Sequence, residues 1–238
     1  MSGQDQIDAT LRALGHNNLP PPPLSAELEA ELATIKPVKA RRPLLRFALH
    51  CLVSIGYGAA ILWLLKLRPD LGRLPTVWIL VYCAAWLSGF LVLGWFALVP
   101  GRGNVMPNWR YAGIGAVFTA GGFIVAGLIF DRNVPNVSHL CNADAVELVA
   151  HGTVCLKWGL ITATVPVLVG MLLIRGSIPV GSRWVGAALG AGGGSLGGLM
   201  LHLHCHNADP LHMGFVHGGV VVVAALLGAL IIPRFTDV

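Results

Sequence analysis

Histidine and cysteine side chains gather in two stretches of this chain, and both residue types bind soft transition metals. Seven of the nine histidines and three of the five cysteines lie there. On a helix, His151 and Cys155 are four residues apart and share a face, as do His202 and His206. Sets of four cysteine and histidine ligands form tetrahedral zinc sites. The candidate metal ligands are therefore His151, Cys155, His202, Cys205, His206 and His212.

Two alternatives to a metal site are open for this cluster. Histidines at a membrane surface can hydrogen-bond to water, lipid headgroups and loop carbonyls, and the chain has no CxxC or HExxH motif that would make a metal site specific. The cysteines also allow redox chemistry, because Cys141, Cys155 and Cys205 could pair or react in an oxidising compartment. A site for zinc or another soft transition metal is thus one hypothesis, and a thiol sensor is another.

The composition indicates which elements must position these residues. Hydrophobic residues make up 55% of the 238 residues, charged residues 11%, and the mean hydropathy is +0.72, which argues against a water-soluble domain. A membrane-spanning helix needs about 20 mostly apolar residues, roughly twice the length of a barrel strand. Six runs reach that length: Phe47–Leu65, Val77–Val99, Tyr111–Phe130, His151–Ile174, Trp184–Leu203 and His212–Ile232. We therefore predict an all-α integral membrane protein with six transmembrane helices.

The first 46 residues differ from the rest and are expected in water. They hold five of the eleven acidic residues and the proline run Pro20–Pro23, and they lack the apolar stretch and cleavage site of a signal peptide. We predict a cytoplasmic arm at 1–46 and a transmembrane sensor domain at 47–238.

Two short amphipathic patterns in this arm predict helices that need a partner. Apolar residues recur with helical spacing at Ile7, Leu11 and Leu14, and again at Leu28, Leu32 and Ile35. Helices of about ten residues are marginal alone, and the arm has too few apolar residues for its own core. A binding partner is therefore expected to cover both apolar stripes.

Lysine and arginine near the helix ends predict the orientation, because basic residues are retained on the cytoplasmic side. With the N-terminus inside, ten basic residues face the cytoplasm and four face outward. The ten are Lys36, Lys39, Arg41, Arg42, Arg46, Arg102, Arg110, Arg175, Arg183 and Arg234, and the four are Lys66, Arg68, Arg73 and Arg132. Both termini are therefore expected in the cytoplasm, with the cysteine and histidine cluster at the outer surface.

The predicted spans favour tight packing over transport. Ion and proton pathways usually need ionisable groups near the midplane, whereas the second, third, fifth and sixth spans have no charged residue at their centres. The fifth span has glycines at every fourth position, Gly186, Gly190, Gly194 and Gly198, which let another helix approach closely. That helix is expected to belong to the same bundle, with a homodimer as the alternative.

Several motifs resemble one known family. They are CLKWG beginning at Cys155, a glycine-rich span ending in LHC at Cys205, and a last span closing as GALIIPRF. Together with a short arm and six spans, they resemble the NrsF-like bacterial membrane anti-sigma factors over nearly the whole chain. The resemblance implies an arm that holds an extracytoplasmic-function sigma factor at the bacterial inner membrane and releases it on stress. It also implies a sensing role for Cys155 and Cys205.

The sequence therefore predicts a non-enzymatic regulator without direct contact to nucleic acid, whose outer cluster senses metal, oxidant or another membrane stress. The main alternative is a metal- or haem-binding membrane protein, including a membrane enzyme, in which the arm is only a tether. Homo-oligomerisation is compatible with both.

Overall fold

The computed structural model describes residues 25, 42–99, 108–130, 145–175, 181–207 and 209–236, with the backbone alone at 130 and 145–151. The chain divides into two compact units, Met1–Arg41 and Arg42–Val238, and the fold described below is that of the second. Several predicted residues lie outside the described ones: Ile7, Leu11, Leu14, Leu28, Leu32 and Ile35 of the arm, and His139 and Cys141 of the third loop.

Six helices of the second unit are long and apolar enough to cross a membrane, which confirms the predicted architecture. The first five are α3 (Pro43–Leu65), α4 (Thr76–Leu98), α5 (Asn108–Phe130), α6 (Ala145–Ile174) and α7 (Ser182–His204). The sixth consists of the π-helical segment η4 (His212–His217), α8 (Gly218–Ile231) and the short α9 (Pro233–Thr236). Among the described residues all regular structure is helical.

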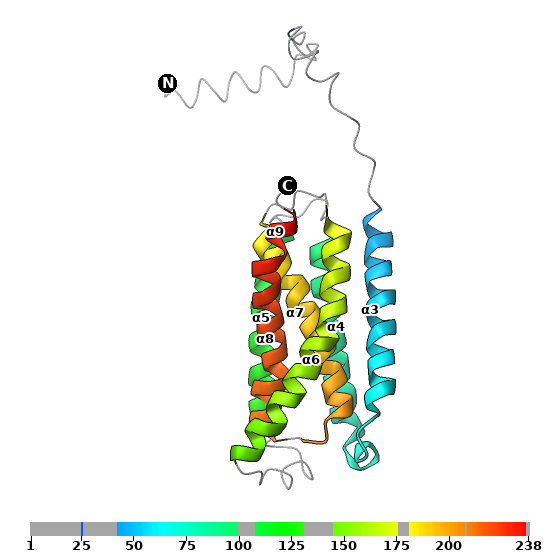
Figure 1. Cartoon of the computed structure of the whole chain (residues 1–238), viewed down its shortest axis with the longest axis vertical. Coiled ribbons are helices and arrows are strands. Elements are labelled where there is room, and N and C mark those ends of the chain that lie inside the picture. Colours follow the sequence, from blue (N-terminus) through cyan, green and yellow to red (C-terminus); the bar gives the residue numbers. More distant parts are fainter. Residues whose placement is uncertain are drawn as a thin grey trace, which may run out of the picture. The chain divides into compact units, whose positions relative to one another are not determined.

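Successive helices run in opposite directions. α3, α5 and α7 run one way and α4, α6 and α8 the other (Figure 1). The first helix begins at Pro43, four residues before the predicted span. Proline is favoured in the first turn of a helix, where its missing N–H would have no partner within the helix. The end of the bundle at which α7 ends and η4 begins is called the site end below.

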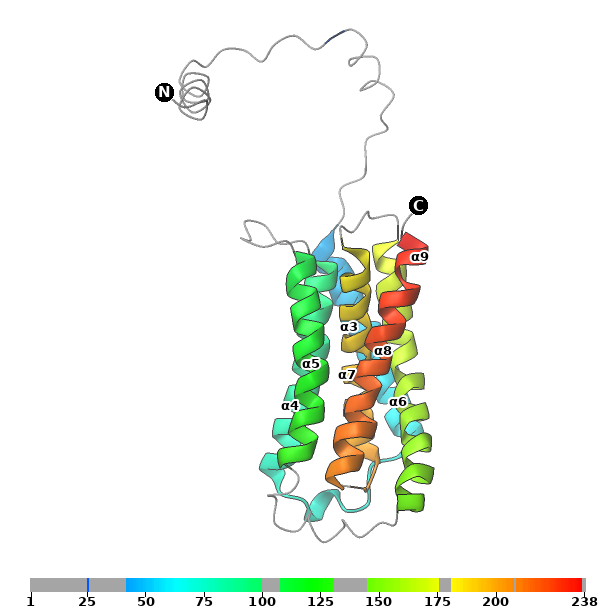
Figure 2. The same ribbon diagram turned by 90° about the vertical axis from the view of Figure 1, so that its left-hand side faces the viewer.

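α7 lies at the centre of the bundle, with α4 and α5 on one side and α6 on the other (Figure 2). Some 94% of its span is buried, against 17% for α3. Its glycines explain this position, because a Cβ on Gly190 would fall on the Ala224 carbonyl oxygen of α8, and one on Gly198 would fall on the Trp86 ring of α4. The glycine ladder therefore packs inside a single chain, which leaves no room on that face for a second copy.

Aromatic packing joins α4, α5 and α3 around this central helix. The Trp86 ring stacks on Phe123 with ring centroids 3.5 Å apart, and Phe90 is fully buried beside them. Large apolar side chains such as Leu52 and Phe118 face outward with 72% and 75% of their surface exposed. An apolar exterior of this kind suits a helical bundle in lipid.

Candidate metal centre

Two cysteines and two histidines converge at the site end of the bundle. Cys155 comes from α6, Cys205 directly follows α7, and His212 and His217 come from η4. The Cys155 thiol donates to the Cys205 sulfur at 3.5 Å, and His212 Nε2 lies 3.4 Å from that sulfur. One ligand atom from each of the four residues lies within 4.8 Å of the other three.

A close crossing of α6 and α7 brings the two cysteines together. A Cβ on Gly197 of α7 would fall on the Gly159 carbonyl oxygen of α6, so these backbones touch. Cys155 precedes Gly159 by one helical turn. Small residues at such a crossing allow the approach, and the sulfurs of residues 50 positions apart in the chain come into contact.

A short capped turn leads from α7 to the two histidines. Asp209 accepts hydrogen bonds from the backbone N–H groups of Leu211 and His212 at 2.9 and 3.2 Å, as an N-cap residue does. Pro210 follows at the first helical position, where proline is favoured. His212 therefore enters the site from the first turn of the last span.

The π-helical geometry of η4 explains why both histidines point to one site. In an α-helix, residues five apart are separated by about 140° around the axis. A π-helix joins residue i to i+5 and so aligns His212 with His217. Their ring centroids are 5.1 Å apart. Single turns of π-helix occur frequently at functional sites.

Burial leaves these donor atoms without other partners. Cys205 is 7% exposed, and His212 and His217 are fully buried. Within the described part of the chain, His212 Nδ1 and both ring nitrogens of His217 have no hydrogen-bond partner. An unsatisfied buried polar group costs about 1–3 kcal/mol, so the site gains stability from a ligand that engages them.

The structure brings together three of the predicted ligands, Cys155, Cys205 and His212, and adds His217. His217 could not be found by α-helical spacing, because it lies five residues after His212. Its position on an apolar span beside two glycines was the available signal. The side chain of His151 lies outside the described residues, although its backbone belongs to α6.

The group of four ligand atoms does not include His202 or His206. The His202 ring is buried between Trp78 and Tyr82 of α4, with centroids 4.5 and 5.0 Å away. His206 is exposed, and its backbone carbonyl is bound by Arg68. Their i, i+4 spacing therefore does not direct them to a common ligand, because α7 ends at His204 between them.

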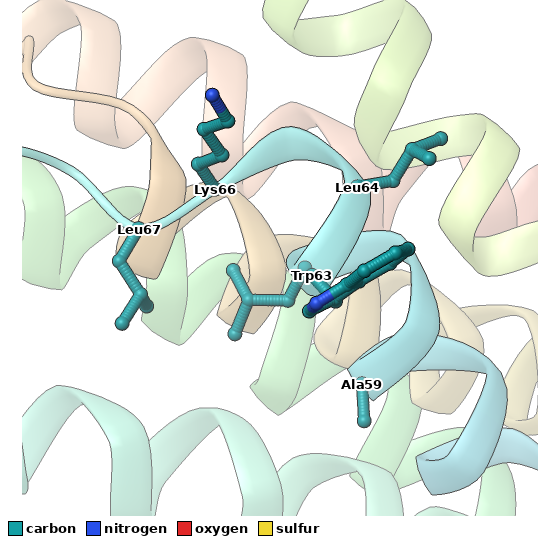
Figure 3. A pocket seen from close by; sticks show the side chains of 6 residues that line it. Ala59, Trp63, Leu64, Lys66 and Leu67 are labelled. Atoms are coloured by element: carbon teal, nitrogen blue, oxygen red, sulfur yellow. The ribbon is translucent and has the colours of Figure 1, made fainter.

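A pocket of about 710 Å³ lies elsewhere, along the last turns of α3 and the residues after it (Figure 3). Ala59, Leu62, Trp63, Leu64, Lys66 and Leu67 line it. Trp63 is 82% exposed, as expected for aromatic side chains at a membrane boundary. None of the four converging residues lines this pocket, so it is separate from the candidate metal centre.

The comparison with protein families identifies the chain. The family model for the negative regulator of sigma F, NrsF, matches residues 32–237. The chain belongs to this family. No curated protein and no solved structure matches it. Membership makes the chain a negative regulator with a sigma factor as its partner, which confirms the family suggested by the motifs around Cys155 and Cys205.

Proposed function

We propose that the chain is a membrane anti-sigma factor that holds an extracytoplasmic-function sigma factor through its N-terminal arm. It releases the sigma factor when a soft metal ion binds Cys155, Cys205, His212 and His217. The observation that supports this proposal is the convergence of four soft or borderline donors from three elements of the fold. The chain acts as a regulator and catalyses no reaction.

Two distances in the site match the edges of a tetrahedral zinc site, while all four ligand atoms lie within 4.8 Å of one another. Zinc binds cysteine sulfur at about 2.3 Å and histidine nitrogen at about 2.0–2.1 Å, so the edges of such a tetrahedron measure about 3.3–3.8 Å. The Cys155–Cys205 sulfur distance is 3.5 Å, and the distance from the Cys205 sulfur to His212 Nε2 is 3.4 Å. Both fall in that range, and thiolate with imidazole suits zinc and copper-type ions.

Ligand binding would change the site chemically as well as fill it. Cysteine ligates as the thiolate and histidine through a neutral ring nitrogen, so binding releases the thiol protons. The Cys155–Cys205 hydrogen bond is then replaced by two bonds to the ion. Because the ligands come from α6, from the residue directly after α7 and from η4, a bound ion would join the ends of these three elements.

Disulfide formation is the second candidate, favoured by the 3.5 Å separation of the Cys155 and Cys205 sulfurs. A disulfide requires about 2.05 Å, the loss of two protons and the transfer of two electrons to an external oxidant. This chemistry leaves the two buried histidines without a role. The metal hypothesis uses all four residues and is therefore preferred.

The proposed location is the bacterial inner membrane, with both termini in the cytoplasm and the site end outward. Arg46, Arg110 and Arg183 lie near the opposite end of the bundle. Basic residues at the site end would argue against this orientation. The charge of Arg68, however, is buried and paired with Asp70, so it is a weak signal for topology. An ion would then reach the site from outside the cell.

The proposal is tested by purifying the full chain with its sigma factor from membranes and adding Zn²⁺. We expect a soluble sigma factor to co-purify and to be released as about one ion binds per chain. Aspartate replacement of Leu11 or Leu28 should weaken sigma binding by about 1–3 kcal/mol, because each removes buried apolar surface. Stoichiometric metal or haem without a sigma factor would instead favour the metalloprotein alternative.

Two control variants test whether the response depends on the cysteines of the site. Cys51→Ser and Cys83→Ser remove the other described free thiols and should bind and release sigma as the wild type does. If Zn²⁺ binds but leaves the sigma complex intact, metal binding is not the signal that releases the sigma factor. If the Leu11 and Leu28 variants still sequester sigma fully, the arm is not the docking element.

A further inference from the structure

The loop between α3 and α4 contains a buried charged side chain that the metal site does not use. Arg68 is 2% exposed, and its side chain is fully shielded. Its Nε and Nη2 atoms donate to the two carboxylate oxygens of Asp70 at 2.7 and 2.8 Å. A buried charge needs such pairing to be tolerated.

Arg68 also binds the end of α7 on both sides of Cys205. Its guanidinium donates to the backbone carbonyls of His202 at 3.5 Å and His206 at 3.2 Å, and its backbone N–H donates to the carbonyl of Leu203 at 2.9 Å. The last carbonyls of a helix have no partner within the helix, and a cation is favoured there. Arg68 supplies both hydrogen-bond donors and a positive charge at this helix end.

A neighbouring contact tightens the same attachment. His204 Nδ1 donates to the Lys66 carbonyl oxygen at 2.9 Å. Lys66 adopts a left-handed backbone conformation with φ of 66°, which residues with a side chain rarely adopt. The loop after α3 is thus bent to hold the residues that flank Cys205.

The helix on the other side of this loop is the one that follows the arm. α3 ends at Leu65, three residues before Arg68. Its Tyr57 hydroxyl donates to the Ile161 carbonyl oxygen of α6 at 3.2 Å. α3 is therefore tied to α7, which precedes Cys205, and to α6, which contains Cys155.

Resting on the proposed function, we infer that Arg68, held by Asp70, is the positioning residue that couples the metal site to α3. The carbonyls that it binds flank Cys205, so a shift of Cys205 toward an ion moves the groups that hold Arg68. The displacement passes through the loop to α3 and on to the arm. A purely structural cap would stabilise α7 but would not change the response to bound metal.

The experiment compares Arg68→Lys and Asp70→Asn with the control Arg73→Lys in the full chain, each at matched membrane level. Arg73 lies in the same loop, in η1 (Leu71–Arg73), and is exposed. Zn²⁺ stoichiometry and sigma-dependent transcription are measured together. We expect Arg68→Lys and Asp70→Asn to bind about one ion but to lose at least about tenfold in induction at equal occupancy. Arg73→Lys should respond as the wild type.

A second measurement needs no metal and guards against variants that fold poorly. Amide hydrogen exchange over 203–207 should be at least about fivefold faster in Arg68→Lys than in wild type, and unchanged in Arg73→Lys. Equal exchange in all three would overturn the attachment, and wild-type induction in Arg68→Lys and Asp70→Asn would overturn the coupling. A wild-type chain that binds no Zn²⁺ would instead overturn the proposed function, while the exchange result still decides whether Arg68 holds α7.

Discussion

The middle and the end of α7 both pack against neighbouring helices, but the groups that meet at the two places differ. In the middle, glycines let α6 and α8 approach until backbones touch, as at Gly190 and Gly197. At the end, α6 and η4 supply side chains beside Cys205, and two thiols and two imidazoles converge within 4.8 Å of one another. Close approach therefore packs backbones together where glycines face the neighbouring helices, and it forms a candidate binding site where donors converge.

Residue type alone does not make a site, as the other end of the bundle shows. His50 and Cys51 are adjacent in α3, and His50 is 2% exposed. Its ring packs 5.2 Å from Phe90 and over Gly94. Neither residue belongs to the cluster of metal-binding side chains, because no second element among the described residues supplies a donor there. Convergence of several elements is what distinguishes the site end.

The largest expected effect comes from removing either cysteine at the site end of the bundle, Cys155 of α6 or Cys205 directly after α7. Cys155→Ser and Cys205→Ser should each weaken Zn²⁺ binding by at least about 100-fold and abolish sigma release, because serine removes the thiolate ligand while keeping the size. The double variant should add little, since the two act as one unit. Titration with Zn²⁺ in detergent measures the first effect and sigma-dependent transcription the second.

Serine at Cys51 is the matched control, because its thiol is remote from the cluster. Normal binding and induction in both site variants would remove the cysteines from the mechanism. Strictly additive partial losses would show that they act separately.

The fold was predictable from the sequence because long apolar runs have few alternatives. All six spans were found, with ends within a few residues except for α6, whose helix begins at Ala145 rather than near His151. The ladder of Gly186 to Gly198 indicated tight packing, and the structure shows α8 and α4 against it. The spans and the glycine ladder depend on the length of apolar runs and on residue spacing, and both can be read directly from the sequence.

The site was predictable only in part, because its geometry departs from the α-helical period. Cys155, Cys205 and His212 were named, whereas His217 required the π-helical turn that aligns it with His212. His202 was expected among the ligands, but its ring is surrounded by aromatic side chains of α4. Which face of α7 meets which neighbour depends on tertiary packing. The role of Arg68 was hidden for the same reason, since loop arginines usually lie in solvent.

The next effect tests the middle of α7. Gly190→Ala should lower the free energy of unfolding by about 1–3 kcal/mol, because the added Cβ would fall on the Ala224 carbonyl oxygen. Gly121→Ala in α5 is the control, since nothing lies within 4 Å of its added Cβ. Thermal unfolding in detergent measures both. Equal stability of the two variants would show that α7 and α8 do not pack backbone against backbone at this position.

A smaller effect separates two buried histidines at the site end of the bundle, His217 of η4 and His202 of α7. His217→Gln should weaken Zn²⁺ binding by about tenfold or more, because it removes one of four ligands. His202→Gln should change affinity by less than about threefold, since its ring contacts Trp78 and Tyr82 rather than the ligand atoms. Isothermal titration of both variants checks the order. A larger loss in His202→Gln would mean that the ligand set of the sequence prediction is the better one.

The smallest effect concerns the attachment of the α7 end at low pH. The hydrogen bonds from Arg68 hold the pKa of Asp70 below its usual range, although partial burial opposes this. A carboxylate with a lowered pKa stabilises the folded state fully above its ordinary pKa of about 4, and that stabilisation is lost as the pH falls through the folded value. The Tm of the wild type should therefore fall more steeply between about pH 4 and pH 2 than that of Asp70→Asn. Parallel curves would show that the Arg68–Asp70 ion pair contributes nothing to the stability of the folded chain.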